Sequence, residues 1–231
     1  MVLEGLFKKA EKEKPTEGLE LRNLEAALQE HELRLLYYKK IIEKYGAMIN
    51  EYEEKNIPEL KSLVNGKENA IQEIKARLQD ELMAEKNNGN VHEFNYESDF
   101  PKLAEKIFKY SQNFKHIHAN LPVSFWLSSA EILELQAADP FDRALFLCSL
   151  LRAFDAKSKV LVVELENNLI HPIVACEISG KLHILDPSQK DAKFDNFSDT
   201  EIDAILTGFS FDGNKFLKKA YEFNDEEYTE F

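Results

Sequence analysis

The chain has 231 residues, of which 44% are hydrophobic and 31% charged, and its formal net charge is −13 at pH 7. Its 16 Phe and 8 Tyr are enough to form a core, which excludes a globally disordered protein. The acidic charge disfavours binding to a phosphate backbone, and no run approaches the roughly 18 apolar residues needed to cross a membrane. No secretory signal is recognisable at the start, so we expect a cytoplasmic protein. Because of its acidic charge, we also expect no nucleic-acid partner.

A helical arm is predicted to follow a charged, flexible lead-in over residues 1–18. The arm covers 19–86 as a coiled coil of two helices, the first over 19–55. From Leu21 onward, apolar and aromatic residues recur in alternating steps of three and four, which keeps one seam on one side of a helix. The seam consists of Leu21, Leu24, Leu28, His31, Leu35, Tyr38, Ile42, Tyr45, Ile49 and Tyr52.

The second helix of the arm is predicted to start at Asn56-Ile57-Pro58-Glu59, with Asn56 or Ile57 near its N-cap. Its apolar stripe contains Leu60, Val64, Ile71, Ile74, Leu78 and Leu82. Asn65-Gly66-Lys67 weakens this stripe. Two arrangements are open: the helices fold into an antiparallel hairpin, or the kinked arm runs on and forms a homodimer. We favour the hairpin, because His and Tyr on the seam are bulky for a tight parallel dimer.

A linker is predicted over 87–94, because Asn87-Asn88-Gly89-Asn90 is typical of a turn. The second domain, over 95–223, is predicted to be α+β. Its expected strands lie at residues 160–163, 170–178 and 182–188, and Asp212-Gly213-Asn214 predicts the turn of a hairpin. The acidic residues 224–231 are expected to form a solvated tail.

Three motifs of this domain follow one another in a suggestive order. Ala138-Asp139-Pro140-Phe141-Asp142-Arg143-Ala144 opens an apolar helix, His171-Pro172-Ile173 lies in a strand, and Leu185-Asp186-Pro187-Ser188 ends the next strand. Together with Phe125-Trp126, this order resembles the transglutaminase-like superfamily over about residues 95–190. The resemblance implies a papain-like cysteine-protease-type fold of helices and an antiparallel sheet. In that family a Cys opens the helix, a His acts as base and an Asp orients it.

The sequence departs from the family at the nucleophile, because Pro140 stands where the resemblance places the Cys. Proline has no nucleophilic atom, although Asp139 as N-cap and Pro140 at the first helical position suit the start of a helix. The resemblance therefore implies a pseudoenzyme in which Pro140, His171 and Asp186 are vestigial catalytic positions. Together with Trp126 and Asp139, they are the candidate lining of a binding cleft.

No other residue is expected to replace the nucleophile. Cys148 lies about two turns into the apolar helix, and Cys176 lies five residues after His171, on the opposite face of a regular strand. Both are interpreted as reduced core residues. No Cys/His cluster with ligand spacing and no glycine-rich phosphate loop is present in the sequence, so we expect neither a metal nor a cofactor.

These observations predict a non-catalytic protein-interaction module that binds a protein or peptide through the arm and the vestigial cleft. An alternative is a thiol hydrolase or acyltransferase with an unrecognised nucleophile and His171 as base. A third reading is a structural spacer, in which the arm sets a distance and the domain only caps it. The fold by itself does not decide between these functions.

Overall fold

The computed structural model describes residues 15–53, 55–86, 93–117, 125–194 and 202–231. Residues 1–14 of the expected lead-in and residues 87–92 of the expected linker lie outside this part of the chain. The chain divides into two compact units. The first contains nearly all of helix α1 (Pro15–Glu53), and the second contains the other helices and the strands. None of the described helices is both long enough and apolar enough to cross a membrane.

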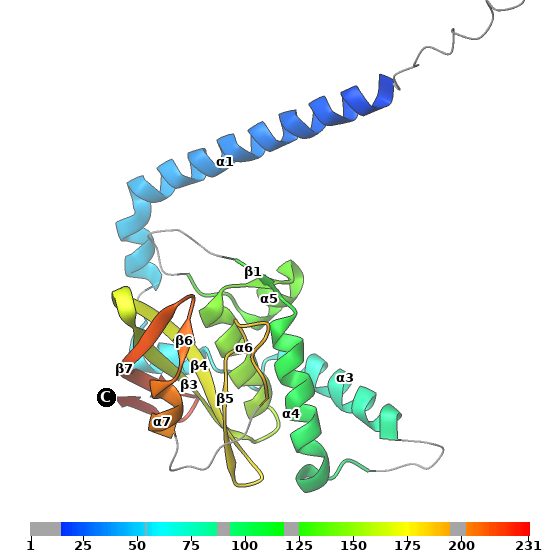
Figure 1. The fold of residues 1–231 in the computed structure, drawn as a ribbon, viewed down its shortest axis with the longest axis vertical. Helices are drawn as coiled ribbons and strands as arrows, with labels where there is room; N and C mark the ends of the chain where they lie inside the picture. Colours follow the sequence, from blue (N-terminus) through cyan, green and yellow to red (C-terminus); the bar gives the residue numbers. More distant parts are fainter. Residues whose placement is uncertain (1–14, 54, 87–92, 118–124, 195–201) are drawn as a thin grey trace, which may run out of the picture. The chain divides into compact units, whose positions relative to one another are not determined.

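Helix α1 confirms the long first helix that was predicted over 19–55. It has 39 residues and is therefore about 58 Å long, at 1.5 Å per residue. The described side chains of its seam are exposed or half-exposed, including Leu24, Leu28, Leu35 and Tyr38. Helix α1 is drawn in blue in Figure 1.

The next two helices are α2 (Ile57–Ser62) and α3 (Asn69–Lys86). Asn56 caps α2 as predicted: its side chain accepts a hydrogen bond from Glu59 N, and the Glu59 side chain accepts one from Asn56 N, both at 3.0 Å. The hairpin between α1 and the second helix is not confirmed. The stripe of α3 is already buried in the core of the second unit. It packs there against α4 (Tyr96–Gln112), α5 (Ser129–Leu135) and α6 (Pro140–Arg152).

Gly66 lies in the break between α2 and α3, where the chain passes close to the backbone of Ala153. A Cβ atom at Gly66 would lie 2.8 Å from Ala153 N and 3.0 Å from Ala153 Cα, so a side chain would clash with backbone there. Next to it, Val64 is buried and Asn65 N donates to Ser149 Oγ at 3.0 Å. The segment between the helices therefore docks closely on the end of helix α6.

A sheet of six antiparallel strands is the centre of the second unit. Its order is β5-β4-β3-β7-β6, with β8 also paired to β7. The strands are β3 (Lys157–Leu165), β4 (Leu169–Ile178), β5 (Lys181–Leu185), β6 (Ser210–Phe211), β7 (Asn214–Phe223) and β8 (Tyr228–Glu230). A short 3-10 turn η1 (Glu166–Asn168) joins β3 to β4. The α+β class is therefore observed.

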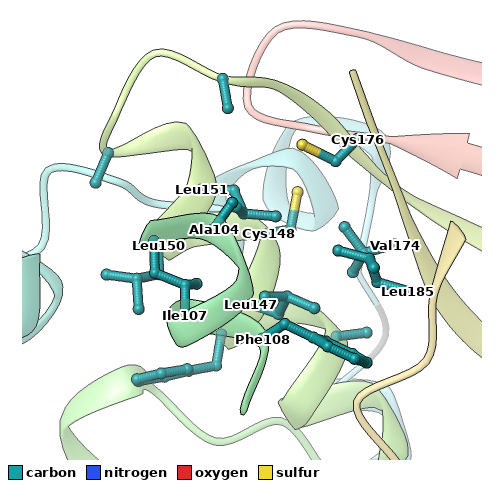
Figure 2. Close-up of a cluster of buried hydrophobic side chains, with 14 of the residues drawn as sticks. Ala104, Ile107, Phe108, Leu147, Cys148, Leu150, Leu151, Val174, Cys176 and Leu185 are labelled. Carbon is teal, nitrogen blue, oxygen red and sulfur yellow. The ribbon is translucent and has the colours of Figure 1, made fainter. Parts of the chain in front are cut away.

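Both faces of this sheet are covered. On one face, α6 (Pro140–Arg152) packs against β3 and β4, and α4 (Tyr96–Gln112) packs against α6 (Figure 1). Figure 2 shows part of the resulting core, in which side chains of α4, α6, β4 and β5 meet. A smaller apolar cluster, which includes a residue of α7 (Ile202–Thr207), covers the other face. The members of this second cluster are Leu161, Val163, Leu165, Ile173 and Leu206.

The C-terminal part of the chain contains two hairpin turns, one between β6 and β7 and one between β7 and β8. The predicted turn at Asp212-Gly213 is confirmed between β6 and β7, and both residues have positive φ, 49° and 78°. The acidic end does not form the solvated tail that was expected, because Tyr228–Glu230 pair with β7 as β8. The side chain of Asn224 accepts hydrogen bonds from Glu226 N and Glu227 N, each at 2.8 Å, and so turns the chain back.

Candidate functional site

The first candidate position is the start of helix α6. Ala137–Ala138 form the short strand β2, which pairs in parallel with β1 (Lys115–His116), and the chain then turns into the helix. Asp139 caps the helix as predicted, since its Oδ1 accepts a hydrogen bond from Asp142 N at 2.8 Å. Pro140 is the first helical residue. The place that suits an activated thiol is therefore occupied by a ring without a nucleophilic atom.

The second candidate position is the pair of His171 and Asp186. His171 lies on β4 opposite Val163, and Asp186 directly follows the last residue of β5. His171 Nε2 is 2.9 Å from Asp186 Oδ2, and the two residues are 1% and 4% exposed. Asp186 also accepts hydrogen bonds from Ser188 N and Gln189 Nε2, both at 2.8 Å. The structure thus brings these two residues together as a buried pair.

Two aromatic rings that sequence analysis did not single out cover His171. The imidazole stacks on Phe211, with ring centroids 3.9 Å apart and planes at 24°, and Phe209 lies 5.8 Å away. Phe209 and Phe211 lie two residues apart at the start of the predicted hairpin. That alternate spacing was a signal that both rings face one side.

The side chain of His171 and helix α6 lie on opposite faces of the sheet. His171 shares its face with Val163 and with the phenylalanines of the smaller cluster, whereas α6 packs on the face that presents Val160 and Val174. In an antiparallel sheet, residues directly opposite each other project to the same face, and alternate residues of one strand to opposite faces. The His171 imidazole therefore lies on the face of the sheet that α6 does not cover. That it lines one cleft together with Pro140 stays a prediction.

Arg143 links the start of α6 to the turn that carries Asp186. The side chain is 1% exposed, and its guanidinium donates to four backbone carbonyls: Ala138 O and Gln112 O at 3.3 Å, Pro187 O at 3.1 Å, and Phe114 O. Burial lowers its pKa, which the carboxylates of Asp186 and Asp139 partly offset. Sequence analysis missed this role, although an arginine in a strongly apolar helix was a visible signal.

Trp126 packs on the first turn of α6 but lines a different hollow. Its ring meets Phe141 edge-on, with centroids 5.1 Å apart, and Leu127 N donates to Asp142 Oδ1 at 3.0 Å. It lines a pocket of about 340 Å³ together with residues of α5 (Ser129–Leu135), α6 and the segment around Asn65. Neither Pro140, His171 nor Asp186 is among the lining residues of this pocket.

Both cysteines of the chain are free and buried. Figure 2 shows Cys148, on α6, and Cys176, on β4, among the side chains of the core. Burial raises the pKa of the Cys148 thiol to about 12 and also raises that of Cys176. Cys176 belongs to the cluster on the α6 face, opposite to His171, as the spacing of five residues predicted. A thiol that stays protonated in a closed core is a poor nucleophile.

Asp142 gives this region a pH dependence that can be measured. Burial raises its pKa from 3.8 to about 7, and the nearby Asp139 carboxylate adds to this effect. The folded protein therefore holds the Asp142 proton more tightly than the unfolded chain does. The resulting stability is fully present below pH 3.8 and is lost as the pH rises through about 7.

We expect Asp142→Asn to become progressively more stable than the native chain as the pH rises. The amide is never charged, and its oxygen can still accept from Leu127 N. Its advantage should grow by about 2 kcal/mol between pH 4 and pH 8. Denaturant unfolding followed by the fluorescence of Trp126, the only Trp in the chain, measures it. Glu134→Gln, at an exposed position, is the matched control, and equal pH profiles for the two variants would contradict the prediction.

The fold and the site define an α+β domain with a buried His–Asp pair and a helix that opens with proline. No protein-family model matches the chain, and no curated protein matches it. Among solved structures, it is similar to a candidate cysteine protease of Cytophaga hutchinsonii, at 15% identity and a TM-score of 0.36. That alignment covers 52% of this chain and 38% of the other.

The chain is also similar to LapG of Legionella pneumophila, at 15% identity and a TM-score of 0.41, over 69% of this chain and 87% of LapG. The values for the calcium-bound form of LapG are 13%, 0.40, 69% and 87%. The chain thus spans well under half of the Cytophaga protein and most of LapG. Likeness at this level does not assign the chain to a family or to an activity.

Proposed function

We propose that this chain is a non-catalytic protein-interaction module. Helix α1 is its association element, and the α+β unit is a transglutaminase-like domain that has lost its chemistry. Three features support the second statement: Pro140 at the start of α6, the protonated core thiols, and the covered imidazole of His171. The partner class is protein, which fits a long helix whose apolar side chains are exposed.

The observation that carries the proposal is that the His171 side chain lies on the face of the sheet that α6 does not cover. The mechanism that the resemblance implies is covalent catalysis with a His base. It needs that base within hydrogen-bond reach of the nucleophile. Helix α6 covers one face of the sheet, and His171 lies on the other, stacked on Phe211. A nucleophile restored at position 140 would therefore also lack its base.

In this proposal, His171 and Asp186 have a structural role. The pair joins the middle of β4 to the turn after β5, and Gln189 extends it by donating to Asp186 Oδ2 and to Ser210 O. Strand β6 is thereby connected to the opposite edge of the sheet. A buried polar network with its groups satisfied makes one arrangement of the segments much more stable than others.

A thiol-reactivity experiment tests this proposal against the thiol-enzyme alternative. The full chain is treated with iodoacetamide at pH 8, folded and in guanidinium, and labelling of each cysteine is followed by peptide mass spectrometry. We expect Cys148 and Cys176 to react about 1000-fold more slowly in the folded protein, because burial suppresses the thiolate. Rapid labelling of either in the folded state, if abolished by His171→Ala, would establish a thiol–base pair and overturn the proposal.

A further inference from the structure

The exposed seam of α1 has no partner helix within the described part of the chain. The stripe of α3, which the sequence offered as the partner, is covered by α4, α5 and α6. Leu24, Leu28 and Leu35 are 68%, 61% and 59% exposed. Together with His31 and Tyr38 these leucines keep the three–four spacing of the seam, which is the pattern of a helix that packs against another helix of the same period.

We propose that two copies of this chain associate through α1 as an antiparallel coiled coil. The inference deepens the proposed function only in that α1 is the association element, and it does not depend on whether the α+β unit is catalytic. Full overlap of the two seams places Leu28 of one copy opposite Tyr45 of the second copy. It likewise places Leu24 opposite Ile49, His31 opposite Ile42, and Leu35 opposite Tyr38.

The core layers favour this direction. Each heptad contributes two residues to the seam, and these two core positions carry different residue types. Leu28, Leu35 and Ile42 occupy one of them, and His31 and Tyr38 occupy the other. In an antiparallel pair every layer except Leu24–Ile49 combines one aliphatic residue with one large polar-tipped residue. In a parallel pair His31 would meet His31 and Tyr38 would meet Tyr38, which places two rings and two polar groups in one layer.

The residues that flank the seam favour the same direction. Antiparallel overlap brings Glu32 of one copy beside Lys39 of the second copy, and two-fold symmetry repeats this pair of opposite charges. On the other flank, Ala27 lies beside Met48, a small residue beside a large one. In a parallel pair Glu32 would face Ala27, and it would gain no partner of opposite charge. Charges at flanking positions chiefly determine orientation and choice of partner.

Cross-linking between two single-cysteine variants tests the direction. Leu28→Cys and Tyr45→Cys chains are mixed and treated with a short bismaleimide. We expect cross-links between the two variants and almost none within either variant alone. In the antiparallel pair the two copies of position 28 are separated by 17 residues of helix rise, about 25 Å, which exceeds the reach of the reagent. The native thiols of Cys148 and Cys176 are buried, so the unmodified chain gives the background.

A matched control uses positions at the same level on the outward side of the helix. Leu33→Cys mixed with Lys40→Cys should cross-link at least about 10-fold less, because the diameters of both helices separate them. Light scattering gives the second readout. The native chain should be a dimer, Leu35→Glu should raise the dissociation constant about 100-fold by burying a charge, and Leu33→Glu should leave it unchanged.

Two outcomes would overturn the proposal. Cross-linking of Leu28→Cys to itself would establish a parallel pair, and a monomeric native chain at all concentrations would exclude the dimer. Neither outcome would change the labelling of the core thiols, so failure of this inference is distinguishable from failure of the proposed function.

Discussion

Replacing Arg143 with leucine is expected to lower the free energy of unfolding by about 3 kcal/mol, because four backbone carbonyls lose their donor at once. Those carbonyls belong to Gln112, Phe114, Ala138 and Pro187, which come from three separate segments. The guanidinium is buried, so water cannot simply take its place. An unsatisfied buried carbonyl costs about 1 kcal/mol or more, and removing a buried charge returns part of that loss.

Arg143→Lys is the matched control for this experiment. Lysine keeps the charge and much of the length, but its ammonium cannot reach carbonyls in several directions as a planar guanidinium does. We expect it to recover less than half of the lost stability, by chemical unfolding followed with circular dichroism. If both variants unfold at the native midpoint, the carbonyls have other donors and the assigned role of Arg143 is wrong.

Replacing Asp186 with alanine is expected to cost a further large amount, about 3 kcal/mol. The carboxylate accepts from His171, Ser188 N and Gln189, and alanine removes this acceptor from all three, although Gln189 keeps its hydrogen bond to Ser210 O. Asp186→Asn keeps one oxygen acceptor and should lose about half as much. Thermal unfolding by calorimetry measures both variants on the full chain.

A double-mutant cycle with His171→Ala separates a structural pair from two independent residues. If the two side chains stabilise the fold through each other, the combined loss should fall short of the sum of the single losses by at least about 1 kcal/mol. Additive losses would contradict the direct coupling that the 2.9 Å contact indicates. A loss of partner binding without loss of stability would instead assign the pair to a ligand site.

Much of the local structure was predictable from residues close together in the sequence. Capping is decided within a few residues, so Asn56 and Asp139 could both be recognised as helix starts from the residues that follow them. The turn at Asp212-Gly213 follows from residues that tolerate positive φ. Strand periodicity placed His171 and Cys176 on opposite faces, which the structure confirms.

The candidate cleft could not be predicted in the same way. Periodicity establishes that two residues of a strand differ in face, but it does not say which face a given helix will cover. The motifs around Pro140 and His171 therefore occurred in the order expected from the resemblance, although His171 projects to the face of the sheet that α6 does not cover. The order of motifs along a chain does not determine how they meet in space.

The sequence alone was enough to predict the starts of α2 and α6, the turn at Asp212-Gly213 and the length of α1. It also shows that position 140 carries a proline and therefore no nucleophile. Contacts between distant segments were needed to show that α3 belongs to the globular core, that Arg143 binds carbonyls of three segments, and that the last residues form β8. The two kinds of feature differ in how far along the chain the interactions that determine them extend. Caps, turns and periodicity depend on neighbours within one or two turns of chain, whereas burial depends on which apolar faces from distant segments cover one another.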